Sequence, residues 1–489
     1  MKLYVKIITL LLAICCLATA FVACDSEEQN TENEQTTTTE ESTTAEEKLE
    51  VHPTITKKNY NDECYVHVFE RVQLLYTEEG EDDVMTEALF SRQEKLHDYL
   101  GVDLVGIQTG NLNVYGTDFT TAVKNKDGSV DVLVCSAYVS IADFILQGYL
   151  RKYNDLEGIN LDADYWKTDY MEEVMIEGDT YLGYSDFNIF NTHVISFNKK
   201  MLEQYSDALD ESLYDSVRNY RWTVDKMISL ANLVYIDATA DGKSADDTFG
   251  ISGNQWIPFI GFLHASNIPL VEENEKGDYQ VSVYNEKYQE KTTALVDKLH
   301  ALSKSDSAWF KYRIEDTPLI PMTSGRTLMY IEGTGGLVKY LDYDIDFGVV
   351  PFPMFDESQK DVGYRSFNYD GFITFPSYMR NESMSVETIE LLSFFSEPVQ
   401  TAYYEKQLGK QVADVPDDRE MLQIVWDGIC TDFGLAYSYV NSSLDKNLYM
   451  LPVLTHANTT ENIASYVKSY ERTANTALIK WVKSYKAKQ

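Results

Sequence analysis

The chain has 489 residues, which is too long for one compact hydrophobic core and predicts two lobes or domains. Hydrophobic residues make up 44% of the chain and charged residues 24%, so most of it can fold as a soluble globular body. The net charge of −37 repels phosphate backbones, which excludes nucleic acid as an expected partner.

The first 23 residues have the pattern of an export signal. Two lysines precede an uncharged apolar run over residues 7–23, which falls short of the roughly 20 residues that a membrane-spanning helix needs. The run ends Phe21-Val22-Ala23-Cys24, which resembles the lipobox of bacterial lipoproteins, where the cysteine is acylated. This resemblance implies a signal peptide over residues 1–23 and a lipid anchor, such as palmitate, on Cys24.

Residues 24–58 are predicted to be a disordered acidic spacer. The tract through Glu50 is rich in Thr and Glu and has almost no apolar side chains to offset the entropy lost on ordering. Like charges repel one another along the tract and extend it. We therefore expect a tether that holds the body away from a membrane and that folding does not need.

From about Asn59 onward, strand-like and helix-like patterns alternate, which predicts an α/β fold. Apolar residues at helical spacing predict helices over 87–100, 223–234, 286–302, 385–395, 398–407 and 462–486. Short apolar runs predict strands over 102–107, 130–135, 181–184, 194–198, 327–331 and 346–350. The continuous run 130–135 is typical of a strand buried on both faces of a parallel sheet. Ligands lie off the carboxyl ends of such strands, so the turn that follows it is a candidate site.

These segments, in this order, resemble the extracellular solute-binding proteins of family 1, the group that includes maltose-binding protein. The markers of the resemblance are Asp131–Val134, Gly178–Tyr181 leading to Ile195–Lys200, Tyr220–Asp225, Phe249–Ile251, Met329–Glu332 and Phe347–Pro353. The resemblance implies a periplasmic-binding-protein-like fold of type II. In that fold, two α/β lobes are joined by a hinge of two or three crossing strands and hold a solute in the cleft between them.

The resemblance also implies the course of the chain between the lobes. Crossings are expected near 184–188, 370–373 and 409–413. Lobe 1 then comprises residues 59–184 plus 372–412, and lobe 2 comprises residues 185–371 plus 413–489. One cleft tryptophan of maltose-binding protein has no counterpart, because Glu332-Gly333-Thr334-Gly335-Gly336 stands in its place. This departure puts a malto-oligosaccharide ligand in question, but not the fold.

A sugar site needs flat apolar faces for stacking and planar polar groups that bond hydroxyls. The resemblance aligns eight positions in turns or at strand ends with the cleft: Tyr138, Asp186, Asn191, Trp256, Glu332, Thr334, Tyr369 and Asp370. Trp256 is expected to stack on the ligand from lobe 2, and Tyr138 to face it from lobe 1. The Gly-rich turn at Thr334 either binds the ligand through backbone amides or is a plain turn or helix start.

The expected function is that of a lipid-anchored binding protein at the extracellular face of a bacterial membrane. It would act as a monomer with the permease subunits of an ABC transporter and capture a carbohydrate, with an oligosaccharide as the expected form. No nucleophile elbow, H-E-x-x-H or P-loop occurs, so neither an enzyme nor a cofactor is expected. Two alternatives stay open: the same scaffold for a peptide or polyamine, and an anchored glycoside hydrolase whose paired carboxylates a sequence does not reveal.

Two smaller features bear on disulfides and metals. Cys64, Cys135 and Cys430 are the cysteines of the body, and an odd number permits at most one disulfide among them. Cys135 lies in an apolar run, which favours a buried, inert thiol. The segment that begins at Asp237 resembles a calcium loop, but it has Thr239 at the third position in place of Asp or Asn and Thr248 at the twelfth in place of Glu, which favours a plain acidic turn over residues 237–247.

Overall fold

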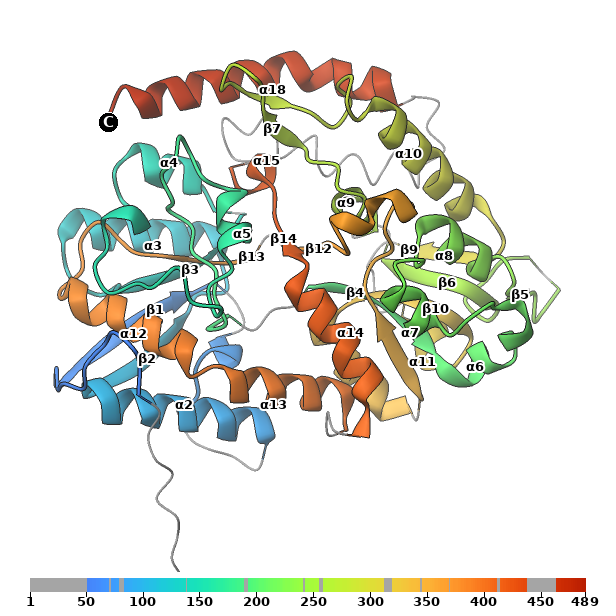
Figure 1. Cartoon of the computed structure of the whole chain (residues 1–489), viewed down its shortest axis with the longest axis horizontal. Coiled ribbons are helices and arrows are strands. Elements are labelled where there is room, and N and C mark those ends of the chain that lie inside the picture. Colours follow the sequence, from blue (N-terminus) through green and yellow to red (C-terminus); the bar gives the residue numbers. More distant parts are fainter. Residues whose placement is uncertain are drawn as a thin grey trace, which may run out of the picture. The chain divides into compact units, whose positions relative to one another are not determined.

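The computed structural model describes residues 51–69, 72–78, 83–137, 139–188, 192–240, 242–254, 258–311, 319–343, 345–368, 370–410, 414–437 and 463–489. Residues 51–489 form one compact unit (Figure 1). The predicted signal peptide, Cys24 and the spacer up to residue 50 lie outside the described residues. Within the described part of the chain, no helix has the length and apolar character needed to cross a membrane.

Helices and strands alternate along the body, as the α/β prediction requires. The α-helices are α2 (Val84–Leu100), α3 (Leu112–Asn125), α4 (Ile141–Leu146), α5 (Thr168–Glu172), α6 (Lys199–Glu203), α7 (Leu213–Arg218), α8 (Val224–Ala231), α9 (Pro258–Ala265), α10 (Gln289–Lys304), α11 (Ile320–Thr323), α12 (Glu382–Phe394), α13 (Glu397–Leu408), α14 (Pro416–Asp427), α15 (Phe433–Ala436) and α18 (Ile463–Lys486). The 3-10 helices are η1 (Val72–Leu74), η2 (Tyr153–Asp155), η3 (Ser206–Ala208), η4 (Thr334–Tyr343) and η5 (Glu357–Asp361). All six predicted helices are confirmed, within a few residues at each end.

The strands form two larger sheets and two short ladders. They are β1 (Asp62–Val68), β2 (Val102–Gln108), β3 (Val132–Ser136), β4 (His193–Asn198), β5 (Tyr235–Ile236), β6 (Thr248–Asn254), β7 (Val271–Glu273), β8 (Tyr279–Val281), β9 (Ala308–Lys311), β10 (Thr327–Gly333), β11 (Phe347–Val350), β12 (Ser366–Phe367), β13 (Asp370–Thr374) and β14 (Ile429–Cys430). Five of the six predicted strands are confirmed. The sixth, 181–184, makes only an isolated bridge between Gly183 and Ile373.

The first sheet has the strand order β13-β3-β1-β2. β1 runs parallel to β2 and β3, whereas β13 runs antiparallel to β3. Every residue of β3 is buried, as its continuous apolar run predicts. Strand β1 was not among the predicted strands, although its buried residues Cys64, Val66 and Val68 alternate with more exposed ones. That alternation is the ordinary signal of a strand.

Helix α2 shows how local sequence sets the boundaries of an element on this sheet. Its N-cap, Asp83, accepts hydrogen bonds from the backbone N–H groups of Met85 and Thr86. The helix ends at Gly101, whose φ of 62° lies in the left-handed region. A Cβ at Gly101 would also lie 1.9 Å from Asn59 Oδ1, so both conformation and space demand glycine there.

The second sheet has the strand order β11-β4-β10-β6-β5, and β9 also pairs with β6. β10 and β9 run parallel to β6, and β4 runs antiparallel to β10 and β11. Helix α14 packs against β11 and α7 on this sheet. Helix α18 contacts α10 and β8, and it also reaches α4 beside the first sheet, where Trp481 Nε1 donates to Ala142 O at 3.1 Å.

Two segments run from one sheet to the other and bond to each other. Gly183 and Ile373 exchange two backbone hydrogen bonds of 2.8 and 2.9 Å. Asn188 Nδ2 donates to Gly371 O at 2.7 Å. These segments correspond to the first two expected crossings. Residues 411–413 of the third lie outside the described residues, and the lobe boundaries stay a prediction.

The N-terminal end of the described chain corrects one prediction. The spacer was expected to extend to residue 58, yet His52 and Ile55 are only 2% and 5% exposed. The prediction is wrong for residues 51–58, because a buried histidine finds polar partners that composition alone does not reveal. Residues 24–50 lie outside the described residues.

The Cys135 thiol is buried, as its apolar run predicts. Cys64, Cys135 and Cys430 are all buried and free of disulfides. Burial is the main cause that raises the pKa of the Cys135 thiol, which keeps it protonated and unreactive.

Candidate functional site

The crossing segments run beside strand ends of both sheets. Gly183 pairs with β13 antiparallel, so the first crossing leaves the first sheet at the carboxyl end of β3. It enters the second sheet at His193, the start of β4, which pairs with Gly333 at the carboxyl end of β10. The carboxyl ends of β3 and β10 therefore flank the same segment. Ligands of open α/β folds lie outside such ends, which makes this the candidate site.

Asp370 lies at the edge of the first sheet. It begins β13 opposite Ser136, the last residue of β3, and it is partly exposed. The side chain of Asn368 brackets it, because Asn368 Oδ1 accepts from Asp370 N and Asn368 Nδ2 donates to Asp370 O, both at 3.1 Å. Asn368 Nδ2 also donates to Tyr184 Oη at 2.7 Å, which ties the two crossing segments together at this point.

Glu332 lies at the edge of the second sheet. Its side chain folds back over the following turn, where Oε1 accepts a hydrogen bond from Gly333 N at 2.9 Å. A Cβ at Gly336 would lie 2.3 Å from the Glu332 carboxyl carbon, so the glycine makes room for this side chain. Glu332 is partly exposed at the carboxyl end of β10.

Thr334 begins the 3-10 helix η4, so the Gly-rich turn is the start of a helix. Its residue exposure is 3%. The Thr334 amide donates to Thr192 O at 2.8 Å, and its hydroxyl accepts from Tyr403 Oη of α13 at 3.2 Å. The buried threonine therefore connects the start of β4 to α13.

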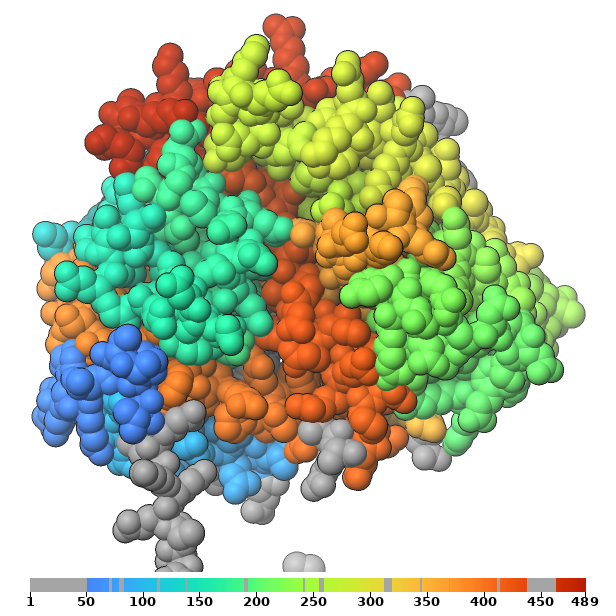
Figure 2. Space-filling model, in the orientation of Figure 1, coloured from blue at the N-terminus to red at the C-terminus, as the bar shows by residue number. Residues whose placement is uncertain are grey.

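Asp186 lies in the first crossing and faces α14. Its Oδ1 is 3.8 Å from Lys167 Nζ, and that ammonium lies 5.0 Å from the ring centroid of Trp426 on α14. Burial raises the pKa of the Asp186 carboxyl above its usual value, and the charge of Lys167 opposes the rise. Figure 2 shows the orange-red α14 segment at the surface between the teal and green parts of the chain.

The other four predicted contacts, Tyr138, Asn191, Trp256 and Tyr369, lie outside the described residues. In the sequence, each of these four residues lies within two residues of a strand of one of the two larger sheets. Tyr138 comes two residues after β3, Trp256 two residues after β6, and Tyr369 directly before β13. Asn191 comes two residues before β4. The four described positions, Asp186, Glu332, Thr334 and Asp370, belong to strand ends and to the first crossing.

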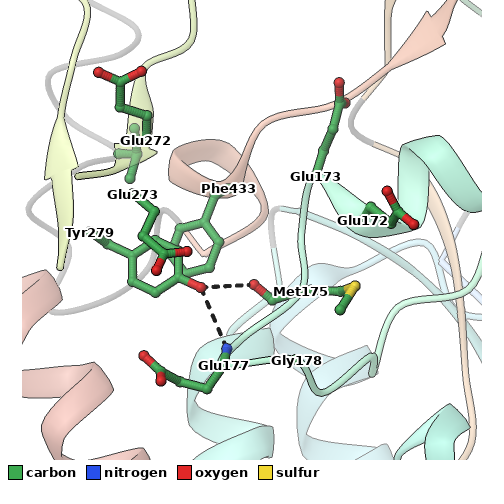
Figure 3. A pocket seen from close by; sticks show the side chains of 10 residues that line it. Glu172, Glu173, Met175, Glu177, Gly178, Glu272, Glu273, Tyr279 and Phe433 are labelled. Carbon is green, nitrogen blue, oxygen red and sulfur yellow. Dashed lines mark hydrogen bonds between the residues drawn. The ribbon is translucent and has the colours of Figure 1, made fainter. Parts of the chain in front are cut away.

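A separate acidic groove was not predicted from the sequence (Figure 3). It has a volume of about 610 Å³ and is lined by Glu172, Glu173, Met175, Glu177, Gly178, Val271, Glu272, Glu273, Tyr279 and Phe433. Tyr279 stacks on Phe433 with ring centroids 4.0 Å apart, and Tyr279 Oη donates to Met175 O at 3.1 Å. The adjacent glutamate pairs at 172–173 and 272–273 are the sequence signal that could have found it.

Ion pairs neutralise much of this groove. Glu173 pairs with Arg365, Glu177 Oε1 lies 2.8 Å from Lys486 Nζ, and Glu272 Oε2 lies 3.2 Å from Lys287 Nζ. Among the residues that the structure describes, no group of three or more His, Cys, Asp or Glu side chains is arranged to hold a metal ion. Of the predicted ligand contacts that the structure describes, Asp186, Glu332, Thr334 and Asp370, none lines the groove.

A smaller pocket of about 180 Å³ adjoins the groove and shares Glu173, Val271 and Phe433 with it. Asp432 lines this pocket, and burial raises the pKa of its carboxyl to about 7. Its Oδ2 accepts a hydrogen bond from Leu270 N at 2.8 Å, which opposes the rise. The pocket therefore holds a carboxyl group that titrates near neutrality.

No family model matches the chain, and no curated protein matches it. Its fold is similar to that of the GacH receptor of Streptomyces glaucescens GLA.O, solved unliganded and with acarbose. The TM-score is 0.53 at 13% identity, over 85% of this chain and 98% of that chain. It is also similar to an ABC substrate-binding protein of Listeria monocytogenes in complex with cycloalternan. There the TM-score is 0.52 at 12% identity, again over 85% of this chain and 98% of that chain. The chain therefore has the two-lobed α/β fold of periplasmic binding proteins that its sequence predicts.

Proposed function

We propose that the protein captures a carbohydrate between the two sheets, as the extracellular substrate-binding component of an ABC importer. The observation that carries this proposal is the pair of bonded crossing segments, which leave the carboxyl end of β3 and enter beside the carboxyl end of β10. Acarbose and cycloalternan, the ligands of the two similar structures, are both oligosaccharides, which supports the same class of ligand here.

The proposed contacts divide into stacking and hydrogen-bonding groups. Tyr138, Trp256 and Tyr369 would supply flat faces for sugar rings. Asp186, Asn191, Glu332, Thr334 and Asp370 form the polar set. Glu332 and Asp370 are the described members that are partly exposed at strand ends, where a carboxylate can accept hydrogen bonds from hydroxyls. The buried Thr334 would act mainly by holding the turn behind Glu332.

The anchor is a second part of the proposal. An export signal over residues 1–23 and acylation of Cys24 would place the protein on the extracellular face of the membrane, where a monomer meets its permease subunits. The Thr/Glu-rich tract up to residue 50 supports this arrangement, because an extended acidic segment gives the body reach.

A ligand screen by thermal shift tests the proposal. The chain is heated with linear and cyclic oligosaccharides, with peptides and with polyamines, and a ligand at a hundred times its Kd should stabilise it by about 2.7 kcal/mol. Stabilisation by an oligosaccharide without its cleavage is the expected result. Stabilisation only by peptides or polyamines would replace the sugar by another solute, and chromatographic detection of glycosidic cleavage would identify a hydrolase.

Variants locate the site. Asp370→Asn and Glu332→Gln should each weaken oligosaccharide binding about tenfold or more, since a hydrogen bond to a charged group contributes about 1.5–3 kcal/mol. Glu357→Gln, on the exposed 3-10 helix η5, is the matched control and should bind like the parent. If Asp370→Asn and Glu332→Gln bind the oligosaccharide as tightly as the parent and the control, the ligand binds elsewhere.

A further inference from the structure

The segment Val51–Lys58 is fastened to the body by hydrogen bonds. The Tyr99 hydroxyl of α2 accepts from His52 N at 3.2 Å and donates to Ile55 O at 2.9 Å. Lys58 N donates to Tyr99 O at 3.0 Å, and Lys58 Nζ lies 2.7 Å from Glu387 Oε1 on α12. The segment that follows the proposed tether is therefore docked against α2 and α12.

The ring of His52 is the buried centre of this contact. Its side chain is 0% exposed, and its Nδ1 accepts from Ile55 N at 3.0 Å and from Thr54 N at 3.3 Å. A backbone N–H can only donate, so Nδ1 must carry a lone pair. The docked histidine is therefore the neutral tautomer with its proton on Nε2.

The other ring nitrogen faces a polar cluster from two elements. His52 Nε2 lies 3.0 Å from Tyr165 Oη, in the loop before α5, and 3.4 Å from Glu390 Oε1 of α12. Glu390 also accepts from Tyr165 Oη at 2.5 Å and from Trp166 Nε1 at 2.8 Å. The edge of the Phe394 ring completes the enclosure, with centroids 4.9 Å apart. The titratable groups facing His52 are thus Glu390, Tyr165 and, from α2, Tyr99.

Protonation of the His52 ring weakens the docking of residues 51–58. When Nδ1 of His52 is protonated, it can no longer accept hydrogen bonds from the Thr54 and Ile55 N–H groups. The new N–H then faces two other N–H groups, so both hydrogen bonds are lost. Burial lowers the pKa of His52 from its usual 6.5, and Glu390 only partly opposes the effect. Glu390 cannot restore the lost bonds, because it lies on the opposite side of the ring, at Nε2.

We infer that His52 is an acid-released clasp, which docks residues 51–58 on the body at neutral pH and frees them when its ring is protonated. Released, the eight residues would add up to about 27 Å to the tether at ~3.4 Å per residue. The free histidine binds its proton below about pH 6.5, so docking weakens as the pH falls through that value. Between pH 7.5 and pH 5.5 the docking equilibrium should shift toward release, by up to about tenfold for a docked ring that stays neutral.

Hydrogen exchange of the full chain tests this inference. The protection factors of the Thr54 and Ile55 amides, corrected for intrinsic exchange rates, should fall by up to about tenfold between pH 7.5 and pH 5.5. His52→Asn is the matched variant, because its side-chain oxygen can accept the same backbone N–H groups but does not titrate. Its protection should not change with pH. Unchanged protection in the parent chain, or an equal fall in the variant, would overturn the clasp.

A second measurement decides the case if His52→Asn does not dock at pH 7.5. The His52 imidazole of the parent chain is titrated by NMR, with the variant spectrum identifying its signal. A midpoint below pH 6.5 that coincides with the loss of Thr54 and Ile55 protection supports the clasp. Protection that stays unchanged down to the midpoint of the imidazole titration overturns it.

Discussion

Asp418 is expected to be the main polar attachment of α14 to the second sheet. It is 2% exposed; its Oδ1 accepts from Tyr214 Oη at 2.6 Å and from Val349 N at 3.1 Å, and its Oδ2 lies 2.8 Å from Lys199 Nζ. Asp418→Ala removes all three interactions and leaves the Val349 N–H buried without an acceptor. Since α14 carries Trp426 to the first crossing, this attachment also bears on the candidate site.

The loss of unfolding free energy in Asp418→Ala can be estimated from the burial of the groups involved. Removing one member of a buried ion pair costs about 3–5 kcal/mol, and each orphaned buried polar group about 1–3 kcal/mol. The Lys199 side chain is 27% exposed, so water recovers part of its charge and the lower end of the range applies. We therefore expect Asp418→Ala to lower the free energy of unfolding by about 3 kcal/mol.

Urea denaturation followed by tryptophan fluorescence measures this loss. The neighbouring Asp417→Ala is the matched control, because that carboxylate is 52% exposed and pairs with Arg218 at the surface. An exposed pair contributes about 0–1 kcal/mol. In a cycle with Lys199→Met, the two positions should couple by about 1 kcal/mol. Equal losses in Asp418→Ala and Asp417→Ala would refute the argument from burial.

Four further outcomes are expected. Cys24→Ala should move the protein from a detergent-extracted membrane fraction to an aqueous one, and unchanged partitioning would contradict the lipid anchor. Trp256→Ala should lower ligand affinity roughly ten- to hundredfold at a nearly unchanged melting temperature, whereas a core tryptophan would cost about 3–5 kcal/mol of stability. Deleting residues 24–50 should leave the melting temperature nearly unchanged, whereas deletion through residue 58 removes the buried His52 and Ile55 and should lower it clearly. Because burial raises the pKa of Asp432 from 3.8 to about 7, the folded chain holds a proton that the unfolded chain releases, so its stability should fall as the pH rises from about 4 to 7. Asp432→Asn should flatten that part of a stability profile measured by urea denaturation, and equal slopes would count against the buried carboxyl.

Local patterns in the sequence were sufficient for six helices and five strands of the fold. The apolar spacing and terminal glycine of α2 predict that helix, because capping and the left-handed glycine act within a few residues of the chain. The continuous run of β3 predicts a strand buried on both faces for the same kind of local reason. The run 181–184 shows the limit: its residues suit a strand, but Gly183 finds a single bridging partner in Ile373, and partners are a tertiary matter.

The candidate site divides in the same way. The resemblance in sequence order selects the turns and strand ends, including Glu332 and Asp370, and the fold places these two at the carboxyl ends of the sheets. The resemblance does not reveal that Asp186 faces Lys167 and Trp426, or that the Thr334 hydroxyl bonds to Tyr403. These partners lie on helices far along the chain, so no local pattern contains them.

The sequence by itself determined the acidic charge, the α/β class and the places of six helices and five strands, because composition is read directly and periodicity, capping and turn chemistry are local properties. The two-lobed fold was implied by the resemblance in sequence order. Only the tertiary structure decided what happens to polar side chains whose partners are distant. His52 looks like the end of a polar tether, yet Tyr165 and Glu390 bury it, 113 and 338 residues further along. A polar group is stable inside a protein when its hydrogen bonds are satisfied, and only the folded chain brings those partners to it.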